Sequence, residues 1–523
     1  MRFTPPSSRA PVLAGDVVAT SQPLAAQAGL DLLARGGNAV DAALAAAIAL
    51  TVVEPTSNGI GSDAFALVWD GAALSGLNAS GRSPASWRSE RFARRSEMPD
   101  QGWDSVTVPG AVSAWVALSE RFGALPFEAL FEPALRYARQ GFLVSPWTAE
   151  AWARAAERLG QRPDFAACFL PGGRSPRAGE RFSSLEMALS LERIAETKGA
   201  ALYEGELAER MVAHAQREGG ALTAEDLGRH QADFVAPLTT RYRDVELCEL
   251  PPNGQGLAAL VALGVLEHLD EDIDPDSARG VHLMVEAMKV GLSDVARHVG
   301  DPAAMRISPE DLLSSSYLAT MAESIDDERA FEPRALPPRH GGTVLVVAAD
   351  KSGRACSFLQ SNYMGFGSGV VVPGTGISLQ NRGAGFTLEP GHPNVVAGSK
   401  RPFHTILPGM ALQGGRPLLC FGVMGGPMQP QGHVQMVVRV VGRGDDPQTA
   451  IDAPRWRLLD GRRLWLEPGF SDAVIDGLRA RGHDVVVAER RSVAFGGAQA
   501  IVAVDEGWCA GSDGRRDGQA VGR

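Results

Sequence analysis

A threonine at the head of an apolar run is the residue of this sequence whose type and position most readily support chemistry. Thr343 follows Gly341 and Gly342 and begins TVLVVAAD, a run typical of a buried strand. The preceding stretch, ESIDDERAFEPRALPPRHGG, is charged and proline-rich, which indicates an exposed loop. A flexible start to a strand is one interpretation of Gly-Gly-Thr. The other is that the chain is cut between Gly342 and Thr343.

An N-terminal threonine would carry the base that its own hydroxyl needs. A hydroxyl is a poor nucleophile until a base removes its proton. A free α-amine, with a pKa of about 7.7–8.0, is partly neutral at physiological pH and can act as that base. The cut is chemically reasonable, because the Thr343 hydroxyl would attack the carbonyl of Gly342, which presents no side chain. The spacing alone leaves both interpretations open.

The sequence contains no motif that indicates a metal site or a nucleotide site. GIGSDA (59–64) matches the pattern G-x-G-x-x-A, but a helical pattern precedes it and a strand pattern follows it, the reverse of a dinucleotide site. H-E-x-x-H is absent, and the ten histidines lie far apart in the sequence. We therefore expect no metal site and no organic cofactor.

Composition places the chain among ordinary globular proteins. Its 523 residues are enough for more than one compact unit, and 45% are apolar while 21% are charged. The formal net charge is −11 and no Lys/Arg-rich run occurs, which disfavours a nucleic acid or an anionic membrane as partner.

The N-terminal residues and the cysteines favour a cytoplasmic location. MRFTPPSSRAPVLAGDVVAT lacks the layout of a secretory signal, and the longest apolar run, ALAAAIALTVV, is too short to span a bilayer. The five scattered cysteines form no C-x-x-C pair, so we expect them to be reduced.

The elements that must position Thr343 change in type along the chain. The first third is predicted to be helical, with Asn38 capping a second, alanine-rich helix and Asp41 in its first turn. Short strands follow, residues 111–325 are again mostly helical, and residues after Gly342 are rich in strands. Neither half is complete alone, so we expect a layered α/β fold whose sheets both halves share.

Several stretches resemble the γ-glutamyltransferase (γ-glutamyl transpeptidase) family, in that family's order and over nearly the whole chain. They are GGNAVDAALAAA, PTSNGIGSDAF, SVTVPGAVSAW, PPNGQG, TVLVVAADKSG, FGSGVVVPGTGISLQN, KRPFHTILP, MGGP and SDGRRDGQAVGR. The resemblance implies an N-terminal-nucleophile hydrolase with an αββα sandwich, made as a self-cleaving proenzyme. Residues 1–342 and 343–523 would then form a heterodimer, with a higher oligomer left open.

The resemblance also implies roles for single residues. Thr343 corresponds to the nucleophile, and cleavage would fall between it and Gly342. Gly425 and Gly426 fall where the family builds its oxyanion hole from backbone N–H groups. Ser361 corresponds to a second hydroxyl near the nucleophile, and Tyr363 lies in the loop that lines the pocket.

The sequence departs from the family where glutamyl substrates are held. Ser80 stands in place of the arginine that binds the α-carboxylate, with Arg82 two positions away, and His404-Thr405 replaces a pair of serines. Gly385 replaces the acidic residue that holds the α-amine. Because a buried ammonium without a carboxylate partner is costly, the glutamyl amine has no evident binding group.

The residues that remain favour an acyl group that bears a carboxylate. Asn381, Arg382, His404 and Thr405, with Arg82, are the candidate substrate-binding residues. This pattern is closer to the family's oxamate amidohydrolases and cephalosporin acylases, which act on other acyl groups. We expect an amidohydrolase that cleaves a small oxamate-like or glutaryl-like amide through a Thr343 acyl-enzyme. The alternatives are a γ-glutamyltransferase or glutathione hydrolase, and a non-catalytic binding protein of the same fold.

Overall fold

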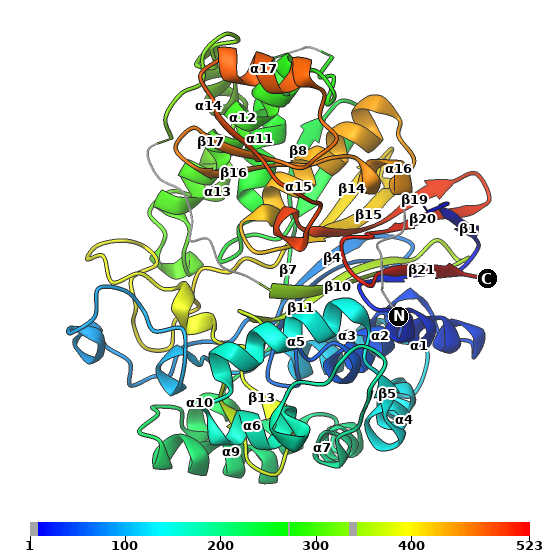
Figure 1. The fold of residues 1–523 in the computed structure, drawn as a ribbon, viewed down its shortest axis with the longest axis vertical. Helices are drawn as coiled ribbons and strands as arrows, with labels where there is room; N and C mark the ends of the chain where they lie inside the picture. The colour runs from blue at the N-terminus through cyan, green and yellow to red at the C-terminus, as the bar shows by residue number, and fades with distance from the viewer. Residues whose placement is uncertain (1–8, 270–271, 334–341) are drawn as a thin grey trace.

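Two antiparallel sheets stacked between layers of helices form the body of the protein (Figure 1). The structure is a computed structural model, and it describes residues 9–269, 272–333 and 342–523. Each of the two main sheets has seven strands. The expected αββα sandwich is confirmed. Gly341 and most of the proline-rich stretch before it (334–341) lie outside the described residues.

The first sheet joins strands from both sides of the Gly342–Thr343 bond. Its order is β21-β2-β10-β11-β3-β4-β7, so β10 and β11 lie between strands from the first seventy residues. The expectation that the two halves share sheets is therefore confirmed. The bounds are β21 Gln519–Gly522, β2 Val17–Thr20, β10 Gly342–Ala349, β11 Ala355–Tyr363, β3 Asp63–Trp69, β4 Leu74–Asn78 and β7 Asp233–Val235.

The second sheet also mixes early and late segments. Its order is β1-β20-β19-β15-β14-β9-β8, with all neighbours antiparallel. The bounds are β1 Val12–Ala14, β20 Gly507–Ser512, β19 Gly497–Val504, β15 Arg416–Met424, β14 Pro408–Gln413, β9 Val245–Glu249 and β8 Leu238–Tyr242.

Apolar side chains fill the space between the two sheets. Leu345 and Val347 of β10 belong to one buried cluster with Cys420 and Met424 of β15. The alternation along β10 that points these residues inward sends Val344 and Val346 to the helices on the other face. Because both faces of β10 are buried, its sequence is a continuous apolar run.

The helices that cover the first sheet follow the local signals of the sequence. Every residue of α2 is buried, and Asn38 and Asp41 form the capping box at its start. Gly29 lies so close to the Ala42 carbonyl that a Cβ would approach it to 2.8 Å, which lets α1 pack tightly on α2. The helices of this layer and its surroundings are α1 Pro23–Ala34, α2 Ala39–Val53, α3 Ala111–Phe122, α4 Glu132–Gln140, α5 Pro146–Leu159, α6 Pro163–Phe169, α7 Leu185–Glu196, α8 Ala200–Tyr203, α9 Glu206–Arg217 and α10 Ala224–Gly228.

A second helical layer covers the other sheet, where α11 and α12 pack together (Figure 1). The helices are α11 Gly256–His268, α12 Ala278–His298, α13 Pro309–Leu312, α14 Ser315–Glu323, α15 Met428–Val437 with a π-helical extension to Arg443, α16 Pro447–Asp452 and α17 Asp472–Ala480. Smaller sheets are formed by β5 Phe142–Leu143 with β6 Arg181–Phe182, β12 Val371–Val372 with β13 Ile377–Ser378, and β16 Trp456–Asp460, β17 Arg463–Leu466 and β18 Asp484–Val487.

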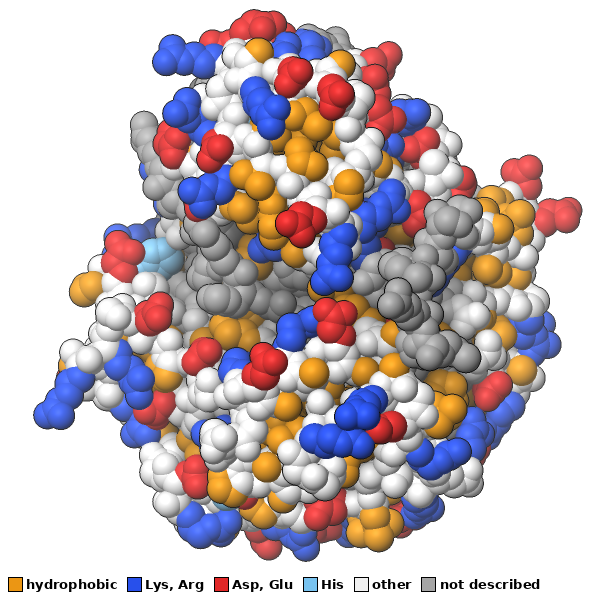
Figure 2. All heavy atoms as spheres, viewed as in Figure 1, with side chains coloured by type: hydrophobic (Ala, Val, Ile, Leu, Met, Phe, Trp, Pro, Cys, Tyr) orange, Lys and Arg blue, Asp and Glu red, His pale blue; other side chains and the backbone are white. Residues whose placement is uncertain are grey.

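The surface view shows charges of both signs interspersed over one face, without a large patch of either sign (Figure 2). Among the described residues, no helix is both long and apolar enough to cross a membrane. None of the five cysteines is in a disulfide.

Candidate active site

Thr343 is buried at an irregularity in the first sheet. The β10–β11 ladder shifts register between Gly342 and Val344, so Thr343 occupies a bulge. Its hydroxyl donates to the Gly342 carbonyl oxygen at 2.7 Å and accepts from Gln429 Nε2 at 3.3 Å. A guanidinium N–H of Arg516 donates to the Thr343 carbonyl at 3.0 Å. The hydroxyl is thus held against the carbonyl that it would attack.

Ser361, near the end of β11, contacts the same carbonyl. Its hydroxyl donates to the Gly342 oxygen and accepts from the Tyr363 backbone N–H at 2.8 Å. An N–H of Arg382 reaches the same Ser361 oxygen at 3.3 Å. One donated and two accepted hydrogen bonds use the full capacity of a hydroxyl. Ser361 therefore connects the Thr343 junction to a buried cation.

Gly425 and Gly426 form the turn between β15 and α15. Their φ angles are +131° and +60°, and a Cβ on Gly425 would lie 3.2 Å from Gly496 Cα. Gln255 Nε2 donates to the Gly426 carbonyl at 2.9 Å and to the Thr405 carbonyl at 2.7 Å. Neither glycine N–H has an acceptor among the described residues. Unpaired N–H groups at a helix start suit an anion.

Arg382 is a fully buried cation without a carboxylate partner. It donates to Thr405 Oγ1 at 2.9 Å, its Nε has no partner, and it lies 4.1 Å from the centre of the Tyr363 ring. Among the described residues, no carboxylate lies within ion-pairing distance. Desolvation lowers the pKa of Arg382 to about 10, so it stays charged at neutral pH. A buried guanidinium of this kind is a site for an anion.

Both ring nitrogens of His404 contact neighbouring groups of the protein. Its Nδ1 accepts from the Ile406 N–H at 3.2 Å, which leaves the proton on Nε2, 3.2 Å from Asp63 Oδ2. Burial, together with Arg382 and Arg401, lowers the pKa of His404 well below its usual value. The ring is therefore neutral at neutral pH, and its two nitrogens are engaged by the Ile406 N–H and the Asp63 carboxylate.

Three more predicted substrate-binding residues differ in the groups that they contact. Tyr363, with φ +77°, stacks under Arg382. The Asn381 side chain bonds the backbone of Met364 and Asp100. The Arg82 guanidinium pairs with Asp301 at 2.9 Å and is about half exposed. The structure brings Thr343, Ser361, Tyr363, Arg382, His404 and Thr405 together and gives Asn381 and Arg82 other partners.

Residues that the sequence prediction missed also contact this group. Gln429 bonds the Thr343 hydroxyl, and Arg516 connects the Thr343 carbonyl to the buried Glu54 carboxylate at 2.9 Å. Asp63 is buried beside His404. Asp63 and Arg516 could have been noticed in the sequence, because each is a charged residue inside an otherwise apolar or glycine-rich run, GSDAFALVW and SDGRRDG.

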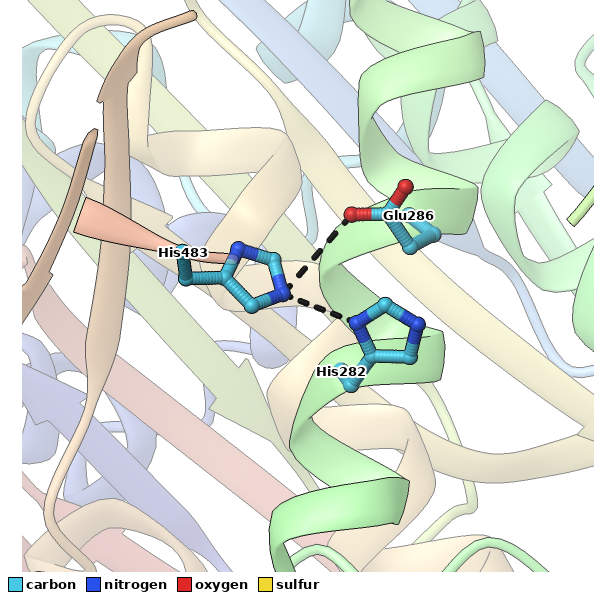
Figure 3. Close-up of side chains that lie close together, drawn as sticks. All are labelled: His282, Glu286 and His483. Atoms are coloured by element: carbon cyan, nitrogen blue, oxygen red, sulfur yellow. Dashed lines mark hydrogen bonds and ion pairs between the residues drawn. The ribbon is translucent and has the colours of Figure 1, made fainter. Parts of the chain in front are cut away.

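Within the part of the chain that the structure describes, two groups of side chains bring metal-ligand residue types close together. In the buried group, His282 and Glu286 of α12 face His483 (Figure 3). Lys289 Nζ lies 2.7 Å from Glu286 Oε1, and the two imidazoles bond each other at 2.8 Å. Glu286 is thus already neutralised by an ammonium, and the group needs no divalent ion to balance its charge. The second group is Asp164, His214 and Glu218, of which Glu218 is exposed.

Comparison with known proteins agrees with the family resemblance noted in the sequence. A family model described as gamma-glutamyltranspeptidase matches residues 25–523. The chain belongs to this family. Its members include N-terminal-nucleophile hydrolases with acylase-like relatives, and this chain is accordingly a hydrolase, which removes the alternative of a non-catalytic binding protein.

Relatives with several printed activities align with this chain over almost their full length. The glutathione hydrolase-like YwrD proenzyme of Bacillus subtilis is 38% identical over 95% of this chain and 97% of its own. The oxamate amidohydrolase proenzyme of Klebsiella pneumoniae is also 38% identical, with the same coverage. The crystal structure of a cephalosporin acylase from Bacillus halodurans superposes with a TM-score of 0.95 at 44% identity, covering 100% of this chain and 98% of that one. The chain is an amidohydrolase of the gamma-glutamyltranspeptidase family.

Proposed function

We propose that this protein is a self-processing amidohydrolase that cleaves small amides whose acyl group bears a carboxylate, through an ester on Thr343. The observation that carries the proposal is the buried, unpaired guanidinium of Arg382, connected to the Thr343 junction by one hydroxyl. The proenzyme names of the two relatives support the processing step.

The first reaction is cleavage of the chain itself. Thr343 Oγ attacks the Gly342 carbonyl carbon while Ser361 donates a hydrogen bond to the carbonyl oxygen. The C–N bond breaks as the proton of the Thr343 hydroxyl passes to the amide nitrogen, and the acyl group is left on Thr343 as an ester. Water then hydrolyses the ester to give a Gly342 carboxylate and a free Thr343 α-amine. The products are chains 1–342 and 343–523, held together by their shared sheets.

The second reaction repeats this chemistry on a substrate. The freed α-amine, with a typical pKa of about 7.7–8.0, takes the proton of the Thr343 hydroxyl as that oxygen attacks the amide carbonyl. The N–H groups of Gly425 and Gly426, which have no acceptor among the described residues, would receive the developing oxyanion. The proton passes to the leaving amine, and water hydrolyses the acyl-enzyme.

Arg382 determines which acyl groups fit. A substrate carboxylate would supply the missing partner of the guanidinium, in exchange for its contacts with water. Gly385 supplies no carboxylate for a glutamyl α-ammonium, and a Cβ there would lie 2.7 Å from the Phe403 carbonyl oxygen, so this position does not accommodate an acidic side chain. Arg382 would repel an ammonium placed beside it.

Arg382 lies near the Thr343 junction. Three hydrogen bonds in series connect the Thr343 hydroxyl, the Gly342 carbonyl, the Ser361 hydroxyl and the Arg382 guanidinium. A substrate with its carboxylate on Arg382 would present its amide carbonyl to Thr343. In oxamate the carboxylate carbon is bonded directly to the reacting carbonyl, whereas in a glutaryl amide three methylene groups separate them. Both classes of amide are therefore candidate substrates.

A substrate panel tests the proposal. Hydrolysis of oxamate, malonic monoamide, a glutaryl amide, a γ-glutamyl anilide and glutathione would be compared by kcat/KM. We expect the short carboxylate amides to exceed the glutamyl substrates by at least roughly tenfold, the value of one charge-assisted contact. Glutathione as the best substrate would instead establish a glutathione hydrolase.

A further inference from the structure

Asp63 is a buried carboxylate directly beside the site, and the reaction described above does not use it. It begins β3 and lies opposite Ser361 in the β3–β11 ladder. Its side chain is fully buried. Oδ1 accepts from the Gly81 N–H at 3.2 Å and Oδ2 lies 3.2 Å from His404 Nε2. Asp63 thus reaches the site from β3, independently of the segments that carry Thr343 and Arg382.

A short route connects Asp63 to Arg382. Because the Ile406 N–H occupies Nδ1, His404 donates to Asp63 through Nε2. The next residue, Thr405, accepts from Arg382 at 2.9 Å. Asp63 therefore helps to fix the segment that holds the guanidinium.

The charges around Asp63 leave Arg382 as its main counter-charge. The groups that act on it are Arg382, Arg401, the neutral His404 and the Tyr203 hydroxyl, which donates to the Pro109 carbonyl. Arg401 already pairs with Asp233 at 2.7 Å. In turn, Asp63 is the one carboxylate among the described residues whose charge acts appreciably on Arg382.

We propose that Asp63 is a positioning residue that balances the charge of Arg382 in the empty site and takes up a proton from solvent when a substrate carboxylate binds there. The proton leaves again when the acid product departs. This inference rests on the proposed function, and it assigns to Asp63 a role in the specificity for acidic acyl groups.

The proposal makes binding depend on pH in a defined direction. Desolvation raises the pKa of Asp63 to about 7, against the opposing effect of Arg382. A bound carboxylate repels the Asp63 anion and raises this pKa further. Below pH 7 Asp63 is neutral with and without ligand, so affinity is constant. Above pH 7 the ligand must protonate Asp63 to bind, so affinity falls by up to about tenfold per pH unit.

The test measures binding of pyruvate, in which a methyl group replaces the amide nitrogen of oxamate. Calorimetry on the processed wild-type enzyme and on Asp63→Asn would be run from pH 6 to 8.5, in buffers of different ionisation enthalpy. For wild type we expect Kd to rise roughly tenfold between pH 7 and 8.5, with uptake of up to one proton. Asp63→Asn should hold its low-pH affinity over most of this range and take up less proton.

The variant controls for the Thr343 α-amine, which loses its charge in the same pH range and is present in both proteins. An SDS gel and a melting curve establish whether Asp63→Asn is processed and folded. The pH dependence of pyruvate binding to the wild-type enzyme is a test that requires no variant. Equal pH dependence and equal proton uptake in the two proteins would overturn the role of Asp63 and leave the proposed function standing. No pyruvate binding and no hydrolysis of short carboxylate amides at any pH would overturn the proposed function itself.

Discussion

At the scale of residues, one carbonyl group organises the site. The Gly342 oxygen accepts hydrogen bonds from both Thr343 and Ser361, so in the proposed self-cleavage one hydroxyl would polarise the carbonyl while the other attacks it. The neighbouring Arg382 shares Ser361 with that carbonyl. Under the proposed mechanism, the hydroxyl that assists self-cleavage therefore also contacts the guanidinium that binds the substrate.

Ser361→Ala should slow self-cleavage. The change removes the donor to the Gly342 carbonyl and leaves the Tyr363 N–H without its acceptor. We expect a roughly 10–100-fold slower conversion, as for loss of one hydrogen bond of about 1.5–3 kcal/mol to a developing charge. The rate is read from a gel time course. Ser357→Ala is the matched control, because this buried β11 hydroxyl donates to the Phe421 carbonyl instead. Equal rates in both variants would argue against the role of Ser361.

Arg382→Ala should lower kcat/KM for carboxylate-bearing amides and leave two chains on a gel. The loss of a charge-assisted contact predicts a roughly 10–100-fold decrease. Hydrolysis of a neutral amide by the same preparations serves as the control, because it does not use the guanidinium. A similar decrease for both kinds of amide would show that Arg382 supports the site rather than the carboxylate.

At the scale of elements, local sequence signals were sufficient to predict individual helices and strands. They were not sufficient to predict which strands pair. The caps and alanines of 39–53 predict α2, and the β-branched run after Gly342 predicts β10. No local signal places β10 beside β2, because Val346 pairs with Thr20 from the far end of the chain. Likewise, Asp63 and His404 meet although 341 residues separate them, so their contact could not be predicted from local sequence.

Gly425→Ala should reduce turnover more than stability. At φ +131°, and with Gly496 Cα 3.2 Å from the new Cβ, the turn must shift and displace its N–H groups. We expect kcat to fall by at least about tenfold, against 10²–10³ for complete loss of one oxyanion donor. Gly444→Ala is the matched control, since it also has positive φ (+79°) but is exposed with open space around it. A normal kcat in Gly425→Ala would remove this turn from the mechanism.

At the scale of the whole molecule, each half is structurally incomplete without the other. β10 and β11 sit in the middle of a sheet whose neighbouring strands β2 and β3 precede residue 70. The sequence predicted this sharing from its incomplete halves, and the resemblance to a family predicted the positions near Thr343. Neither predicted Gln429, Arg516 or Asp63, whose roles depend on burial in the assembled fold.

Activity is expected to survive removal of metal ions. The proposed mechanism uses a hydroxyl, an amine and backbone N–H groups, and the buried His282–Glu286–His483 group is balanced by Lys289. The measurement is turnover before and after dialysis against EDTA. Loss of activity that zinc or magnesium restores would contradict the mechanism.

The most direct test of the account is the N-terminal sequence and intact mass of the smaller chain in the purified protein, alongside Thr343→Ala. We predict chains of about 36 and 19 kDa, dividing the 55.2 kDa in proportion to length, with the smaller one starting Thr343-Val344-Leu345. Thr343→Ala should remain a single, inactive chain. An active protein that stays uncut, or a smaller chain that starts at another residue, would contradict the assignment of Thr343 as the nucleophile.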